Sequence, residues 1–214
     1  MEKRTSAMEL MQEAADWRLI SLLFDRPANG WFDEVKMLGE QSEDKRLKRA
    51  AEAARGEAGE GAFHSIFGPG GPAPAREVTY RSWVQPGYLL SELSCFYDAF
   101  SYKPKTNEAP DHVAVETGFI AYLKFKELYA LECGDGEAAS VTAEAAENFV
   151  ADHLSKMAGK LSRSLSESGY EYLKLAGEAL VERTGPDKDT SEIAVLPVLQ
   201  REDDELFECG SPAI

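Results

Sequence analysis

Cysteine, histidine and long apolar runs are all scarce in this chain. Its 214 residues include three cysteines and three histidines. Cys95, Cys133 and Cys209 are odd in number and form no Cys-x-x-Cys pair, so the pattern predicts neither a disulfide framework nor a zinc knuckle. Unpaired thiols are typical of proteins that work in a reducing compartment.

Membrane and export signals are missing from the pattern as well. No apolar run approaches the roughly 20 residues that a membrane-spanning helix needs. The first residues, Met1 to Ser6, are mostly polar and lead into an amphipathic segment, so we expect no signal peptide. We therefore expect a soluble, cytoplasmic protein with no integral membrane segment.

Basic residues are outnumbered by acidic ones. The chain has 23 Lys and Arg against 38 Asp and Glu, a formal net charge of −15. A nucleic-acid binder is expected to carry a basic patch, so this class is disfavoured. An acidic surface attracts cationic partners over a distance, and it also keeps a protein soluble; the composition leaves both interpretations open.

The strict alternation that marks β-strands is nearly absent, whereas a helical period runs through the chain. We expect an all-α fold, a single-domain helical bundle. A capping box at Ser6–Glu9 predicts a first helix to about Phe24. Further helices are predicted over 31–38, over 44–55, up to residue 67, over 77–101 and over 169–182, with Pro86 as a kink or a fresh start in the region 77–101. A central buried helix is predicted from Pro110 to about 131. Another helix is predicted to about 161, with Thr142 as its cap.

Two stretches interrupt this pattern. Gly68-Pro-Gly-Gly-Pro-Ala-Pro74 is a long Gly/Pro loop that lacks the Gly-Lys-Ser/Thr ending of a phosphate-binding loop, and its prolines lack the N–H donors of a phosphate nest. From Thr184 onward the chain is rich in Pro, Asp and Glu, with one apolar patch at Ile193 to Leu199. We expect a helical domain over 1–183 and an acidic, largely disordered tail over 184–214.

The most informative stretch is Glu108-Ala-Pro-Asp-His-Val-Ala-Val-Glu116. Pro110 suits the first position of a helix, and Asp111 then falls in the first turn, where the helix dipole favours a carboxylate. His112 and Glu116 are four residues apart and share one face. The cluster suits a catalytic dyad, a metal site or a rigid recognition corner, and each residue also suits a simple helix start.

Catalysis has little support in the pattern. No nucleophile sits in an activating context. Di-metal sites in helical bundles use Glu-x-x-His motifs from two helices, and a matching second half is missing here. A metal-dependent helical enzyme that uses Glu108, Asp111, His112 and Glu116 remains the alternative.

Aromatic residues crowd the region before this cluster. Most of them are expected in the core, and a surplus is suited to line a groove for an apolar helix or extended peptide. They are Tyr80, Trp83, Tyr88, Phe96, Tyr97, Phe100 and Tyr102.

Two motifs give the chain a resemblance to the TorD/DmsD/NarJ family of molybdoenzyme maturation chaperones. One is Phe67-Gly-Pro-Gly-Gly-Pro72 with Tyr80 following, and the other is Glu108-Ala-Pro-Asp-His112 leading into Val113 to Leu123. Phe149-Val-Ala-Asp-His-Leu154 is a weaker third match. The resemblance spans roughly residues 10 to 180, including the order of the helices.

The resemblance implies an all-α chaperone with no catalysis, cofactor or metal of its own. Such a protein binds the twin-arginine signal peptide of the catalytic subunit of a molybdopterin oxidoreductase. It holds this client in the cytoplasm until the cofactor is inserted, as a monomer or homodimer. The implied partner-binding residues are Glu108, Pro110, Asp111, His112, Glu116, Phe67, Tyr80, Trp83 and Tyr88. Acidic side chains among them suit pairing with guanidinium groups.

Overall fold

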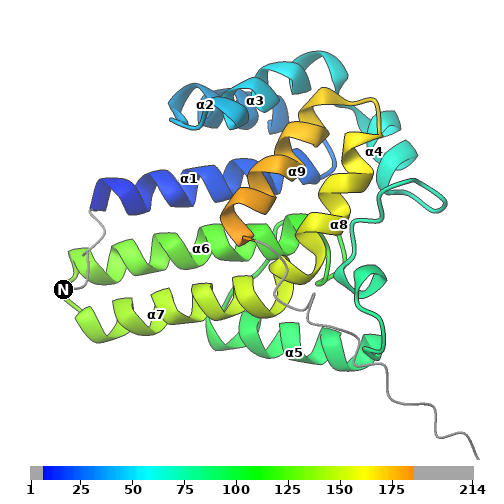
Figure 1. The fold of residues 1–214 in the computed structure, drawn as a ribbon. Helices are drawn as coiled ribbons and strands as arrows, with labels where there is room; N and C mark the ends of the chain where they lie inside the picture. Colours follow the sequence, from blue (N-terminus) through cyan, green and yellow to red (C-terminus); the bar gives the residue numbers. More distant parts are fainter. Residues whose placement is uncertain (1–6, 186–214) are drawn as a thin grey trace, which may run out of the picture.

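Helices make up every regular element of residues 7–185, the part of the chain that the computed structural model describes (Figure 1). The α-helices are α1 (Ala7–Phe24), α2 (Trp31–Gln41), α3 (Lys45–Glu57), α4 (Glu60–Phe67), α5 (Pro86–Ala99), α6 (Val113–Glu132), α7 (Gly136–Phe149), α8 (Ser155–Ser166) and α9 (Glu171–Thr184). A 3₁₀ turn, η1, covers Glu77–Tyr80, and a π-helical turn, η2 (Val150–Leu154), joins α7 to α8. The all-α prediction is confirmed.

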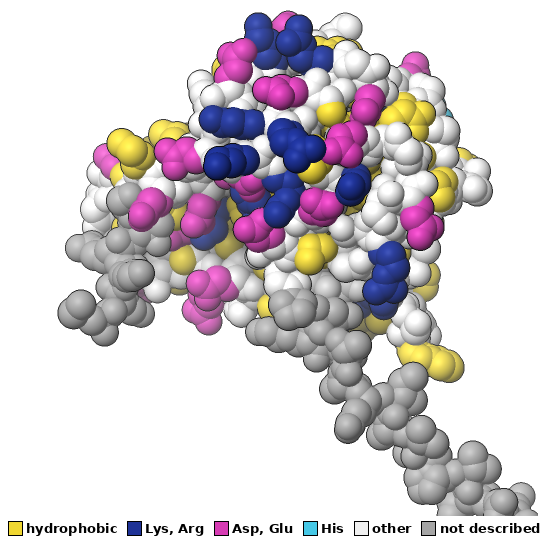
Figure 2. All heavy atoms as spheres, turned by 45° about the horizontal axis from the view of Figure 1, so that its top comes forward, with side chains coloured by type: hydrophobic (Ala, Val, Ile, Leu, Met, Phe, Trp, Pro, Cys, Tyr) yellow, Lys and Arg dark blue, Asp and Glu magenta, His cyan; other side chains and the backbone are white. Residues whose placement is uncertain are grey.

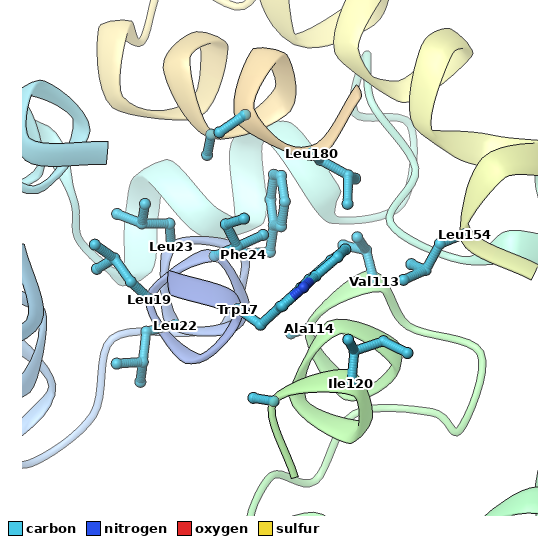
Figure 3. Close-up of a cluster of buried hydrophobic side chains, with 14 of the residues drawn as sticks. Trp17, Leu19, Leu22, Leu23, Phe24, Val113, Ala114, Ile120, Leu154 and Leu180 are labelled. Carbon is cyan, nitrogen blue, oxygen red and sulfur yellow. The ribbon is translucent and has the colours of Figure 1, made fainter. Parts of the chain in front are cut away.

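The hydrophobic core is centred on α1 and α6, which lie side by side (Figure 1). Every residue from Val113 to Ala121 is buried, so α6 is the central buried helix that its composition predicts. Trp17 of α1 lies between the two helices, close to Val113 and Ile120, with Leu180 of α9 nearby (Figure 3). Burying such side chains supplies most of the driving force for the fold.

Small and polar residues let α1 and α6 approach closely. The Ser21 hydroxyl donates a hydrogen bond to the Ala114 carbonyl at 2.8 Å, and the Tyr102 hydroxyl donates to the Val115 carbonyl at 3.3 Å. A Cβ atom added at Gly118 would lie 2.7 Å from the Tyr102 oxygen and 3.0 Å from Oγ of Ser21. A side chain at 118 would therefore displace the Tyr102 hydroxyl from its bond to the Val115 carbonyl.

Two predicted helix starts are wrong. Helix α6 begins at Val113 with His112 as its N-cap, so Pro110 and Asp111 precede the helix. Helix α7 begins at Gly136, where the Asp135 carboxylate accepts from the Ala138 amide at 2.9 Å. Thr142 therefore lies inside α7, and its hydroxyl donates back to the Ala138 carbonyl.

The predicted helical region 77–101 is divided in two. After η1 the backbone of Trp83 takes a left-handed conformation with φ of 75°, and α5 starts afresh with Pro86 in its first turn. Helix α9 runs to Thr184. The predicted Ser6 cap and the predicted tail beyond Gly185 lie outside the described residues.

Charges of both signs interleave on the face that carries α2 and α3 (Figure 2). Arg46 and Arg49 of α3 form ion pairs with Glu178 and Glu171 of α9, at 3.4 and 3.0 Å. These contacts contribute to the attachment of α9 along α3. Among residues 7–185, no helix has the length and apolar character needed to cross a membrane.

Two single glycine-to-alanine variants test the close packing of α1 against α6. Gly118→Ala should lower the free energy of unfolding by about 1–3 kcal/mol, because overpacking outweighs the better helix propensity of alanine. Gly159→Ala in α8 is the matched control, since nothing lies within 4 Å of its added Cβ. The control should gain about 0.5–1 kcal/mol. Urea unfolding of both variants measures the difference, and equal gains would contradict the packing.

Candidate functional site

The segment from Gly68 to Gln85 joins α4 to α5 and passes the start of α6 (Figure 1). A short antiparallel bridge pairs Arg76 with His112. Within it, the Glu77 amide donates to the Asp111 carbonyl and the Val113 amide donates to the Ala75 carbonyl, both at 2.8 Å. These backbone bonds place the side chain of Glu77 near residues of α6.

Three carboxylates meet at this junction, and all three side chains are buried: Glu77, Asp111 and Glu116, here called the acidic cluster. Asp111 Oδ1 accepts from Arg76 Nε at 2.8 Å, and Oδ2 accepts from the Val78 amide at 3.4 Å. Glu77 Oε1 accepts from Arg81 Nη1 at 2.8 Å. Two arginines of the connecting segment thus neutralise two of the three carboxylates.

Glu116 forms no ion pair with either arginine. No donor reaches either of its oxygens. Burial raises the pKa of Glu116 well above its usual value, and the negative charges of Glu77 and Asp111 raise it further. A carboxylate in such surroundings binds a proton, and the protonated group can donate to the neighbouring Glu77 carboxylate. Burial and the two neighbouring carboxylates therefore favour the protonated form of Glu116.

His112 caps α6 and connects it to α4. Its Nδ1 accepts from the Ala114 amide at 3.2 Å, and its ring lies 6.2 Å from that of Phe63 and 6.3 Å from that of Phe67. Its Nε2 lies 3.9 Å from a Glu108 oxygen. Burial, with a smaller effect of Arg76, lowers the pKa of His112 to about 4. The imidazole is therefore neutral at neutral pH.

His153 completes the junction from η2. Its Nδ1 lies 3.1 Å from Glu77 Oε2, and because a carboxylate only accepts, Nδ1 is the donor in this bond. Its Nε2 is buried without a hydrogen-bond partner, and the centroid of its ring lies 5.6 Å from that of Phe96 and 4.7 Å from that of Phe149. Single π-helical turns are frequent at functional sites.

The structure divides the predicted partner-binding residues into three groups. Asp111, His112 and Glu116 are buried. Glu108, Phe67 and Tyr80 are half-buried, and the Tyr80 hydroxyl donates to the Pro74 carbonyl at 2.6 Å. Pro110, Trp83 and Tyr88 are exposed. The fold brings Asp111 together with Glu116, and His112 together with Phe67 and Glu108.

Sequence reasoning missed four residues of the junction: Arg76, Glu77, Arg81 and His153. Only His153 carried a signal, because it lies in the third family motif. The alternative metal site has no support from the geometry, since Asp111 is engaged by Arg76. Within residues 7–185, no three His, Cys, Asp or Glu side chains are placed to hold a metal ion.

Larger surface hollows lie elsewhere on the described part of the chain. A groove of about 790 Å³ runs between α1, α2, α6 and the loop after α5, with Met11, Tyr102 and Phe125 in its lining. A smaller pocket of about 390 Å³ lies at the end of α9, beside Trp17 and Arg183. Neither is lined by a predicted site residue.

Fold and site together define a helical protein whose most unusual feature is a buried, charged corner. The chain matches the sequence model of the nitrate reductase delta subunit family over residues 39–163, more than half of its length. The chain belongs to this family of molybdoenzyme maturation chaperones, whose members bind a molybdoenzyme catalytic subunit. This confirms the resemblance inferred from the motifs. A comparison with curated proteins finds no match.

The depressed pKa of His112 predicts a stability change in acid. Between pH 6.5, its ordinary pKa, and about pH 4, the unfolded chain binds a proton that the folded chain does not. The contribution of His112 is therefore complete above pH 6.5 and is lost as the pH falls, by up to about 3 kcal/mol. His112→Asn keeps a good N-cap acceptor and should reduce this acid loss.

Urea unfolding at a series of pH values from 4 to 7 measures the effect. The difference between wild type and His112→Asn should change steadily across this window. A constant difference would show that His112 titrates alike in the folded and unfolded chains.

Proposed function

We propose that this chain binds the N-terminal twin-arginine signal peptide of the catalytic subunit of a molybdopterin oxidoreductase. It holds that client in the cytoplasm until the cofactor is inserted, and performs no catalysis itself. Membership of a chaperone family whose members bind such a catalytic subunit supports the proposal. The corner formed by residues 67–88 and 108–116 is the proposed site, on a helical domain over 1–183 followed by an acidic tail over 184–214.

The observation that carries the proposal is the exposure of two large aromatic side chains beside this corner. Trp83 is fully exposed, and 76% of Tyr88 is exposed. Trp83 also takes a left-handed backbone conformation, which is rare for a bulky residue and is found at ligand clamps when the surrounding structure enforces it. The chain thus accepts backbone strain at a position where the indole contributes nothing to the core.

The segment before Trp83 is firmly attached, so its indole is presented from a fixed base. Arg81 Nη1 donates to the Asp152 carbonyl at 3.1 Å as well as to Glu77. Lys160 Nζ donates to the Tyr80 carbonyl at 3.0 Å. These contacts tie the segment to η2 and α8 at Arg81 and Tyr80, two and three residues before Trp83. Such preorganisation lowers the entropy cost of binding a peptide.

Signal-peptide chemistry matches the two parts of the corner. The apolar stretch of the peptide would cover Trp83 and Tyr88, and each aromatic side chain buries about 150–250 Å² at about 25 cal/mol per Å². The arginines would be drawn by the net charge of −15 and would pair with accessible carboxylates. Glu108 is the half-buried carboxylate nearest to the exposed Pro110 along the chain.

Isothermal titration calorimetry with a synthetic twin-arginine signal peptide tests the proposal. Trp83→Ala combined with Tyr88→Ala should weaken binding by about tenfold or more, because exposed aromatics that become buried dominate such interfaces. Tyr129→Ala is the matched control, since Tyr129 is 66% exposed near the end of α6. The control should bind like the wild type.

Equal affinities for the double variant and the Tyr129 control would contradict the assigned surface. Absence of binding by the wild type would contradict the proposed function itself. A peptide with both arginines replaced by lysine separates the charge of the peptide from its guanidinium geometry.

A further inference from the structure

The acidic cluster already holds two guanidinium groups, and both come from this chain. Arg76 pairs with Asp111, and Arg81 pairs with Glu77. The unpartnered carboxyl of Glu116, completely buried, faces the same two carboxylates. The cluster is thus a built site for guanidinium groups, and the two arginines show the ligand chemistry that it accepts.

The two arginines are held unequally. The Arg81 side chain is 22% exposed, and its Nη1 atom donates to both Glu77 and the Asp152 carbonyl. The Arg76 side chain is 45% exposed, and one hydrogen bond from Nε to Asp111 is its only side-chain contact of this kind among the described residues. Arg76 is therefore the exchangeable group and Arg81 the fixed one.

Departure of the Arg76 side chain leaves the corner assembled. The backbone bonds from Glu77 to Asp111 and from Val113 to Ala75 do not involve that side chain. The Val78 amide continues to donate to Asp111 Oδ2. What remains is a buried carboxylate with one oxygen unpaired, and such a group requires a new cation or donor. A guanidinium from outside supplies both.

We propose that Arg76 is an internal stand-in for an arginine of the bound peptide, and that a peptide guanidinium takes its place on Asp111. This inference rests on the proposed function and adds the carboxylate that is used and the group that competes for it. In the free chain, Arg76 then occupies Asp111 and prevents weakly binding cations from pairing with it. The peptide must displace Arg76. The apparent association constant of the peptide therefore equals its intrinsic value multiplied by the fraction of chains in which Arg76 is released.

Arg76→Gln is the direct test, with Arg49→Gln as the matched control. Both remove one positive charge and one ion pair, since Arg49 pairs with Glu171 on the surface. Titration with the twin-arginine peptide should show about tenfold tighter binding to Arg76→Gln, because the competitor is gone. Arg49→Gln should stay within about twofold of wild type. The twin-lysine peptide should gain less, since an ammonium lacks the fork of donors.

A second measurement covers the case in which Arg76→Gln folds poorly. In wild-type protein labelled with ¹⁵N, the Arg76 Nε–H signal reports the bond to Asp111, and Arg76→Lys assigns it. A saturating twin-arginine peptide should move this signal and speed its exchange with water. An unmoved signal, or a folded Arg76→Gln that binds no tighter than wild type, overturns the inference.

Failure of the proposed function is recognised separately with a small probe. N-acetyl-arginine amide should raise the melting temperature of Arg76→Gln more than that of Arg49→Gln, and N-acetyl-lysine amide should not. If the signal peptide binds neither wild type nor variant while the arginine probe discriminates, the exchange site stands and the proposed client is wrong. Equal shifts for both variants overturn the exchange site.

Discussion

The pairing of Asp111 and Glu77 with Arg76 and Arg81 is the interaction on which this corner depends. Buried carboxylates are costly unless opposite charges and hydrogen bonds compensate them. Here both cations come from one short stretch, residues 76–81, and a backbone bridge aligns that stretch with the start of α6. The backbone bonds of the bridge hold residues 76–81 beside the carboxylates, and the guanidinium groups then compensate the buried charge.

This arrangement separates stability from recognition within one corner. The core between α1 and α6 is apolar and closely packed, so it requires no help from the acidic cluster. The cluster instead fixes the connection from α4 to α5 and carries Trp83 to the surface. Buried groups therefore position the segment, and exposed aromatics are left for a partner. On the proposed function, exchange of the Arg76 contact would allow this corner to bind a peptide and to release it.

Helical periodicity was sufficient to predict the fold class and the central place of α6. A helix with apolar residues on most sides is stable only when it is buried in the interior. Local cues were less reliable where tertiary contacts compete. Pro110 suited a helix start, yet the residues after it bond to Ala75 and Glu77 and delay the helix to Val113. Thr142 is of a residue type that often caps helices, but Asp135 is the N-cap of α7, seven residues earlier in the chain.

The candidate site was predictable in position and not in detail. Asp111, His112 and Glu116 lie at the start of α6, but Arg76 and Glu77, the groups that surround Asp111, are more than 30 residues away in sequence. Glu77 meets His153 across an even longer separation. Single-sequence patterns report local periodicity and do not encode which distant cation will neutralise a given carboxylate.

The charge state of Glu116 tests the central claim most directly, because burial and the neighbouring carboxylates Glu77 and Asp111 raise the pKa of Glu116. The ¹³C signal of its carboxyl carbon, assigned with Glu116→Gln, can be followed through a pH titration. The account predicts the protonated form at pH 7 and no transition near pH 4.3, the ordinary value for glutamate. An ionised Glu116 at pH 7 that titrates near that value would contradict it.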